Sequence, residues 1–187
     1  LVNDGGIVAN LRKTKWKFLL VPGFVFSQAW VAWRLLRRER VAVIHAHWLL
    51  PQGMIAALLR YLPRSGDVPF LVTSHGADLY ALRGRWLQAA KRFVLRRAAS
   101  VSVVSSAMLG SVMAIGGVPR RIAVEPMGVD LSARFTRDDG EPRSRRELLF
   151  VGRLVEKKGL RFLLDAFPSV LARFPDATLS IAGFGPE

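Results

Sequence analysis

Short apolar runs alternate with amphipathic segments along most of the 187-residue chain. Several of the runs are apolar at every position, which is typical of strands buried on both faces of a parallel sheet. The segments between them place apolar residues three or four positions apart, which predicts helices. The predicted strands are residues 41–45, 69–73, 101–104, 122–124, 148–151 and 177–182.

This alternation of strands and helices predicts an α/β fold with right-handed crossovers. Residues 132–146 interrupt it, because they are polar, charged and almost free of large apolar side chains, as linkers are. We therefore expect two parallel-sheet units, residues 1–131 and 147–187, joined by this linker. The chain begins on Leu1 rather than methionine and ends just after a glycine-rich turn, so we expect a fragment in which both units are incomplete.

Lysine and arginine number 28 against 14 acidic residues, which gives a net charge of +14. This excess favours an anionic partner, such as nucleic acid, an acidic membrane surface or a phosphorylated substrate. The absence of cysteine excludes disulfide scaffolds and cysteine metal sites, and it suits a reducing compartment. The longest apolar run, residues 18–33, is broken by Pro22-Gly23 and is shorter than the roughly 20 residues of a membrane span, so no transmembrane segment is expected.

A helix is predicted between residues 18 and 40, beginning after Pro22-Gly23. Its cations gather in the final RLLRRER stretch, where the helix dipole favours positive charge. Two interpretations remain open for its apolar residues, among them Trp30 and Trp33. They either pack against a sheet or lie in the interface of an anionic membrane.

Polar side chains follow several of the predicted strands. His47, His75, Ser105 and Arg153 each come at or just after a strand's carboxyl end. In open parallel sheets ligands bind in the crevice beyond these ends. The shared position makes the four residues candidates for a functional site.

Two of the three histidines, His45 and His47, would share one face of a strand, which invites a metal interpretation. The only other histidine is His75, and there is no cysteine, whereas a zinc site normally has three or four protein ligands. The chain also lacks an Asp-x-Asp pair that would hold a divalent ion against a diphosphate. We expect a structural role for His45, and neither a metal ion nor another cofactor.

His75 is followed by Gly76, which would let a ligand approach the backbone closely. The His75 imidazole is therefore a candidate catalytic group that donates to a developing charge or positions a hydroxyl; the alternative is a hydrogen-bonded histidine at a strand end. Asp78 is expected to cap the helix that follows. One face of that helix is predicted to contain Leu79, Leu82, Trp86, Ala90 and Phe93.

Residues 147–159, ELLFVGRLVEKKG, combine a buried strand, a glycine turn and the start of a helix. Two cations, Arg153 and Lys158, bracket the loop that follows Gly152. A helix N-terminus with cations beside it is suited to bind a phosphate. The two cations could stabilise a departing diphosphate without a metal; the alternative is two solvated surface cations near Glu156.

Six motifs occur in a fixed order from residue 41 onward: HAHWLLPQG, TSHGAD, VSS, PMGVD, FVGRLVEKKGL and AGFGPE. This ordered set resembles the family-four retaining glycosyltransferases of the GT-B fold. The resemblance implies two Rossmann-like domains, an acceptor-side domain in residues 1–131 and the start of a donor-binding domain in residues 147–187. The family's first strand and its paired-glutamate motif fall outside these 187 residues, as expected for a fragment.

The resemblance also implies roles for individual residues. Arg153 and Lys158 would bind the diphosphate of a nucleotide-sugar donor, Gly152 would admit the phosphates close to the backbone, and His75 would lie beside the donor sugar. The implied reaction moves a sugar to a hydroxyl of a polysaccharide or lipid-linked glycan with retained anomeric configuration. The leaving diphosphate would assist a substitution on the same face of the sugar.

The implied partners are the nucleotide-sugar, the glycan or lipid-linked acceptor and an anionic membrane surface, without nucleic acid. The implied location is cytoplasmic, peripheral on the inner face of the membrane. The residues alone leave two alternatives open. One is a basic nucleic-acid-binding α/β module, suggested by Arg34 to Arg40 and by Lys91 to Arg97. The other is a non-catalytic protein at the membrane periphery.

Overall fold

The computed structural model describes residue 16 and residues 19–63, 68–117, 119–136 and 146–187. The chain divides into two compact units. The first unit is Phe18–Val129, and the second is Asp130–Glu187 together with Leu1–Lys17. Most of the predicted linker, residues 137–145, lies outside the described residues.

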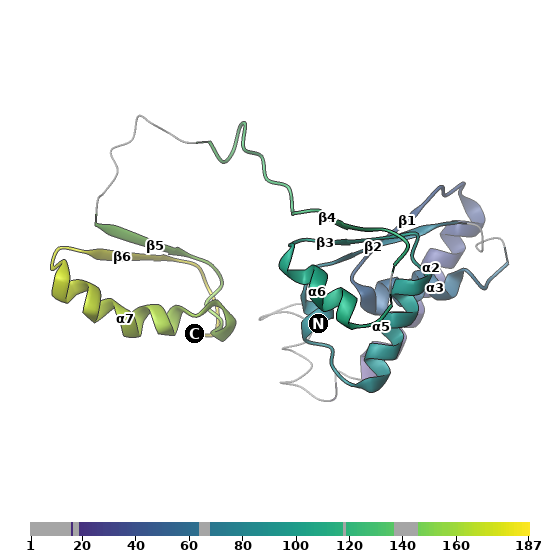
Figure 1. Ribbon diagram of the computed structural model, residues 1–187, viewed down its shortest axis with the longest axis horizontal. Coiled ribbons are helices and arrows are strands. Elements are labelled where there is room, and N and C mark those ends of the chain that lie inside the picture. Colours follow the sequence, from purple (N-terminus) through teal and green to yellow (C-terminus); the bar gives the residue numbers. More distant parts are fainter. Residues whose placement is uncertain (1–15, 17–18, 64–67, 118, 137–145) are drawn as a thin grey trace. The chain divides into compact units, whose positions relative to one another are not determined.

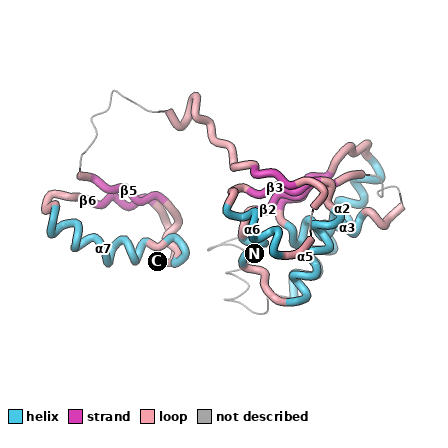
Figure 2. The backbone as a smooth tube through the Cα atoms, in the orientation of Figure 1, coloured by secondary structure: helices cyan, strands magenta, loops and turns pink. Residues whose placement is uncertain are grey.

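The first unit is built on a parallel sheet of four strands in the order β1-β2-β3-β4. Its helices lie on one face of this sheet (Figures 1 and 2). Sequential strands are neighbours, so each connection returns over that same face, which confirms the predicted parallel α/β architecture. The strands are β1 (Ile44–His47), β2 (Phe70–Ser74), β3 (Ser100–Val103) and β4 (Ile122–Val124).

The main core lies between the sheet and these helices. Val72 and Val101 from adjacent strands are fully buried together with Val94 and Val112 from the helices. Gly53 lets the chain pack closely here, because a Cβ at this position would lie 2.9 Å from Cγ1 of Val94. The helical segments are α2 (Leu20–Arg38), η2 (Leu49–Gly53), α3 (Met54–Leu59), α4 (Ala77–Tyr80), α5 (Arg85–Arg97) and α6 (Ala107–Ala114).

Strand β1 and the helices after β2 differ from those predicted. The first strand begins at Ile44 rather than at residue 41, because its pairing with β2 starts there. The single helix predicted after Asp78 is two helices, α4 and α5, with Gly84 between them at a φ of 115°. That conformation favours glycine and turns the chain, so Trp86 is 77% exposed although the predicted apolar face included it.

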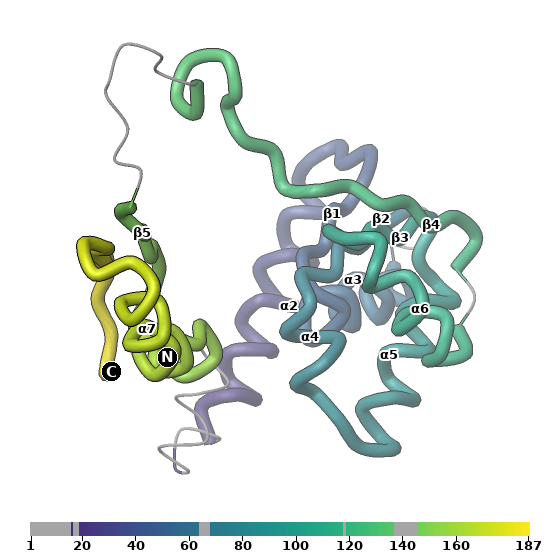
Figure 3. The backbone as a smooth tube through the Cα atoms, turned by 60° about the vertical axis from the view of Figure 1, so that its left-hand side comes forward, coloured from purple at the N-terminus to yellow at the C-terminus, as the bar shows by residue number. Residues whose placement is uncertain are grey.

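Helix α2 begins at Leu20, before Pro22 rather than after it, since the first turn of a helix tolerates proline. One side of α2 packs on α3, beside which it runs (Figure 3), where Leu36 is buried with Ile55 and Leu59. Other apolar side chains of α2 lie at the surface of this unit: Phe26 is 70% exposed. The helix therefore packs through one face, as in the first interpretation, and presents apolar residues at the surface of its unit, as the second requires.

The second unit contains a two-stranded parallel sheet of β5 (Glu147–Val151) and β6 (Thr178–Ala182), paired from Glu147↔Thr178 to Val151↔Ala182. Between the strands come the short 3₁₀ helix η3 (Glu156–Lys158) and helix α7 (Leu160–Arg173), which lies on one face of the pair (Figure 1). The predicted strands and helix of this segment are confirmed. The predicted phosphate-binding loop, which contains η3, connects β5 to α7.

The chain segments that follow β5 and β6 are joined by backbone hydrogen bonds. The amide of Gly152 donates to the carbonyl of Ala182 at 3.0 Å, and that of Leu154 donates to Phe184 at 2.9 Å. A Cβ at Gly183 would collide with the Gly152 carbonyl, and one at Gly185 with the Leu154 carbonyl. The GFG sequence of residues 183–185 therefore has a physical role: it allows two backbones to approach closely beside the predicted phosphate-binding loop.

Candidate functional site

Two histidines that are 28 residues apart in the sequence meet at the carboxyl edge of the first sheet. His47 ends β1, and His75 directly follows β2. Nδ1 of His47 and Nε2 of His75 share a hydrogen bond of 3.0 Å, and their rings are stacked with centroids 5.2 Å apart. One nitrogen must donate and the other accept, so this bond couples the tautomers of the two rings. His47 thereby restrains the orientation of the candidate catalytic residue.

A row of polar side chains continues from these histidines across the sheet. Nε2 of His45 and Oγ1 of Thr73 share a hydrogen bond of 2.8 Å, and Thr73 shares another of 2.6 Å with Oγ of Ser102. Side chains alternate between the two faces of a strand, so this row lies on the face opposite the helices. Sequence reasoning missed Thr73 and Ser102. The alternating SVSV pattern of β3 was the signal, because it marks Ser102 as facing away from the core.

The pKa of His45 is lowered from its ordinary value, first by burial and then by the nearby His47 and His75. Between the lowered pKa and about 6.5 the unfolded chain binds more protons than the folded one, so stability falls as pH falls through this window. We expect the melting temperature of the wild type to fall more steeply below pH 6.5 than that of His45→Gln, measured by circular dichroism. Parallel melting curves would contradict this explanation.

Asp78 does not cap a helix as predicted, because α4 already begins at Ala77. Its buried carboxylate instead ties the ends of two strands together. Oδ2 accepts from the backbone amide of Leu49 at 2.7 Å, and Oδ1 accepts from the hydroxyl of Ser74 at 3.0 Å. Leu49 lies just beyond β1 and Ser74 ends β2, so Asp78 fixes the two segments that carry His47 and His75.

A fully buried cation, Lys91, supports the same region from α5. Its Nζ donates to the carbonyls of Leu79 at 2.9 Å and Leu82 at 2.6 Å, just where α4 ends. Burial lowers the pKa of Lys91, the charge of Asp78 opposes this shift, and Arg83 adds to it. The lysine satisfies carbonyl groups that the end of a short helix leaves without intrahelical partners.

The backbone on either side of the histidine pair adopts unusual conformations. Trp48, directly after His47, has a φ of 82°, which is uncommon for a residue with a side chain. Its amide donates to the carbonyl of Thr73 at 2.7 Å, which helps to hold this conformation. Gly76, directly after His75, has a φ of 93°. The backbone conformation therefore favours glycine at this position by itself, independently of any close approach by a ligand.

Three of the four candidate residues at strand ends belong to the first unit, and they are not all brought together there. His47 and His75 are in contact, whereas Ser105 lies exposed at the start of α6, where its carbonyl accepts from the amide of Met108. Arg153 belongs to the second unit. Among the described residues, no group of three or more histidine, aspartate or glutamate side chains is arranged to hold a metal ion.

In the second unit, Arg153 and Lys158 are exposed and flank the loop between β5 and α7. Neither side chain forms an ion pair with another described residue, and this includes the neighbouring carboxylate of Glu156. The loop backbone is fixed: the Lys158 amide donates to the Val155 carbonyl at 2.8 Å, and Gly159 adopts a φ of 73° where α7 begins. Two cations that have no ion-pair partner in the described part of the chain thus lie near the positive end of a helix dipole.

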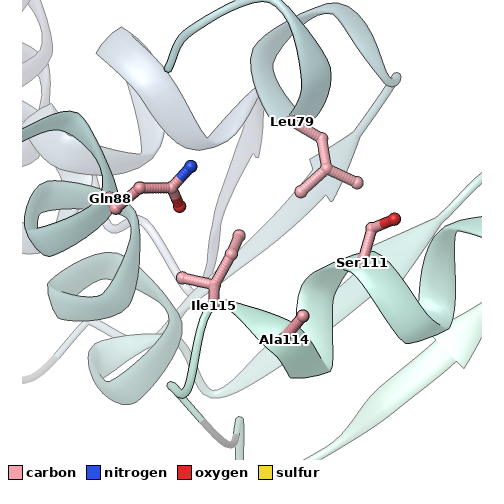
Figure 4. A pocket seen from close by; sticks show the side chains of 5 residues that line it. All are labelled: Leu79, Gln88, Ser111, Ala114 and Ile115. Atoms are coloured by element: carbon pink, nitrogen blue, oxygen red, sulfur yellow. The ribbon is translucent and has the colours of Figure 1, made fainter. Parts of the chain in front are cut away.

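A separate cavity of about 270 Å³ lies among α4, α5 and α6 in the first unit (Figure 4). Leu79 and Ile115 line it together with the amide of Gln88 and the hydroxyl of Ser111. None of the residues predicted for the functional site lines this cavity.

The chain matches two protein-family models. Glycosyltransferase Family 4 matches residues 4–133, and Glycosyl transferases group 1 matches residues 145–187. Among individual relatives, a glycogen synthase of Mycobacterium tuberculosis is 31% identical over 161 residues, which are 81% of this chain and 37% of that protein.

Two further relatives have different names. A phosphatidyl-myo-inositol mannosyltransferase of M. tuberculosis is 51% identical over 67 residues, 34% of this chain and 18% of that protein. A putative teichuronic acid biosynthesis glycosyltransferase of Bacillus subtilis is 31% identical over 140 residues, 68% and 34% of the two chains. The chain thus spans less than two fifths of the length of these curated relatives. It belongs to Glycosyltransferase Family 4.

Proposed function

We propose that this chain is part of an enzyme that transfers a sugar from a nucleotide-diphosphate donor to a hydroxyl acceptor with retained anomeric configuration. The observation that carries the proposal is the loop after β5, where Arg153 and Lys158 are exposed, lack ion-pair partners among the described residues and adjoin the start of α7. Such a loop suits a dianionic diphosphate. The family assignment supports a donor diphosphate as the bound anion, because glycosyltransferases use donors with phosphate leaving groups.

In the proposed reaction the bond between the sugar's anomeric carbon and the diphosphate oxygen breaks, and a bond from the acceptor oxygen forms on the same face. The departing diphosphate accepts the proton of the acceptor hydroxyl. Arg153 and Lys158 stabilise the negative charge that develops on the diphosphate, and Gly152 lets its oxygens come close to the backbone. His75 donates a hydrogen bond to the donor sugar. The reaction invokes no cofactor and no metal ion, because the two cations supply the positive charge.

Nucleotide binding by the full chain tests this proposal. Charge-assisted hydrogen bonds contribute about 1.5–3 kcal/mol each, so Lys158→Ala should weaken binding of the cognate nucleoside diphosphate by about 10- to 150-fold. Titration calorimetry with uridine, guanosine and adenosine diphosphates measures this. Lys157→Ala is the matched control, since Lys157 is the exposed neighbour of Lys158 on η3. Equal binding by the wild type and Lys158→Ala would refute the donor site.

The proposed acceptor is a polysaccharide or lipid-linked glycan, reached from the inner face of the cytoplasmic membrane. Helix α2 supports a peripheral association, because Phe26 and Trp30 are exposed at the surface of its unit while Arg34, Arg37 and Arg38 lie along its later turns. Apolar side chains beside cations are typical of helices that lie in a membrane interface. Within the part of the chain that is described, no helix has both the length and the hydrophobicity to cross a bilayer.

Flotation with liposomes tests the membrane contact. The full chain should float with vesicles that contain anionic phosphatidylglycerol, and Phe26→Gln/Trp30→Gln should float several-fold less because each change removes apolar area from the interface. Tyr80→Gln is the control, since Tyr80 is also an exposed aromatic residue of this unit but lies on α4. Equal flotation of all three proteins would rule out α2 as the contact. The nucleic-acid-binding alternative is not proposed, because a glycosyltransferase family covers residues 4–133.

A further inference from the structure

A second concentration of charge lies at the amino edge of the first sheet, at the opposite end of the strands from the histidine pair. A cavity of about 290 Å³ opens there, bordered by Pro69 before β2, Ala99 before β3 and Arg120 before β4. His75 follows the carboxyl end of β2, which is five residues long, so roughly 16 Å of strand separates this cavity from that site. The cavity is therefore no extension of the histidine site.

Arginine dominates the lining of this cavity. Arg60, Arg96, Arg97 and Arg120 border it, and no carboxylate is among the described residues that line it. None of the four guanidinium groups forms an ion pair with a described residue. Like charges that converge without a counter-charge repel one another, and an anion bound among them removes that repulsion.

The position of these arginines has a partial explanation in the helices. Arg60 follows α3, and Arg96 and Arg97 end α5, so the C-terminal end of a helix dipole favours three of them. This does not account for Arg120, which precedes a strand and still borders the same cavity. The convergence of all four on one cavity therefore needs a further cause.

Arg97 is held in place by two aromatic rings. Its guanidinium carbon lies 5.0 Å from the ring centroid of Tyr61 and 4.8 Å from that of Phe93. Such cation–π contacts restrain the plane of the group without using its N–H donors. A guanidinium fixed in this way matches the paired oxygens of a phosphate at a reduced cost in side-chain entropy.

We propose that the arginine cavity, defined by Arg60, Arg96, Arg97 and Arg120, is a second anion site that binds a phosphate monoester. Four guanidinium groups complement a dianion, and about 290 Å³ admits a phosphate group with a short stem but not a whole nucleotide-sugar and its acceptor. The phosphate is either free in solution or the headgroup of an anionic lipid. This site does not depend on the proposed transfer reaction, because it shares no residue with the donor loop or the histidine pair.

The test compares variants of one parent protein, the full chain with Arg153→Ala and Lys158→Ala, so that the proposed donor site does not contribute to the measured anion binding. Two probes distinguish the sources: inorganic phosphate, followed by calorimetry, and phosphatidylcholine vesicles with and without phosphatidic acid, followed by flotation. The test variant is Arg96→Gln/Arg120→Gln, and Arg120→Gln alone is the second variant if the pair impairs folding. Arg85→Gln is the matched control, since Arg85 begins α5, at the helix end opposite Arg96.

We expect saturable binding to at least one probe, weakened at least tenfold by Arg96→Gln/Arg120→Gln and less than twofold by Arg85→Gln. Binding of inorganic phosphate with this pattern identifies a site for a free phosphate. Binding of vesicles that contain phosphatidic acid, with the same pattern but without binding of inorganic phosphate, identifies a lipid headgroup site. The proposal is overturned if neither probe distinguishes the test variant from its parent, or if Arg85→Gln weakens binding as much as the test variant does.

Discussion

His75→Ala is expected to lower the turnover number of the full-length protein by about 100- to 1,000-fold, because in the proposed reaction it removes the hydrogen-bond donor to the donor sugar. Binding of the nucleoside diphosphate should change little, since the proposed diphosphate contacts come from Arg153 and Lys158 in the second unit. Steady-state kinetics together with calorimetry separate the two effects. His45→Ala is the control, because His45 bonds to Thr73 rather than to His75.

The same experiment extends to His47, which contacts His75 rather than a substrate in this proposal. His47→Ala should reduce turnover less than His75→Ala, because it releases the orientation of the His75 ring without removing the ring itself. A purely structural role for His47 would lower stability without changing the turnover number of the folded protein. If His75→Ala keeps turnover within a few-fold of the wild type, His75 has no catalytic role.

Asp78→Ala is expected to destabilise the first unit by about 3 kcal/mol or more. The change leaves the buried amide of Leu49 and the buried hydroxyl of Ser74 without their acceptor, and each unsatisfied group costs about 1–3 kcal/mol. It also removes the negative charge that partly offsets the burial of Lys91. Urea unfolding followed by circular dichroism measures the free energy of unfolding.

Two variants make the Asp78 experiment specific. Asp78→Asn keeps an acceptor oxygen of the same shape and should recover part of the loss. Glu125→Ala removes an exposed carboxylate from the same unit and should change stability by no more than about 0.5 kcal/mol. If Asp78→Ala behaves like Glu125→Ala, the two hydrogen bonds do not hold the strand ends together.

The strands of both units could be predicted because their apolar runs are continuous and their neighbours in sequence are neighbours in the sheet. The break at Gly84 was harder to see, since apolar residues on both sides fit one helical period. Only the φ of 115° shows that the chain turns there. The contact between His47 and His75 depends on the register of β1 against β2, which pairs His47 with Thr73, and no local pattern specifies such a register.

Buried polar residues were the least predictable part of the site. Lys91 looked like one of several cations on an amphipathic helix, yet it is fully buried because the end of α4 places two carbonyls beside it. Asp78 had the sequence position of a helix cap, but the helix starts one residue earlier and frees its carboxylate for Leu49 and Ser74. Both roles arise from tertiary contacts. The role of Arg153 and Lys158 stays a prediction from sequence and local geometry.

Sugar transfer itself is measured most directly by incubating the full-length protein with a panel of nucleotide-sugars and a hydroxyl acceptor, and by following the anomeric protons by NMR. We predict that one donor is consumed, that the product keeps the donor's anomeric configuration, and that Lys158→Ala lowers the rate at least tenfold while Lys157→Ala does not. Inverted product, or a rate that is the same in Lys158→Ala as in the wild type, would contradict the proposed donor site and its chemistry.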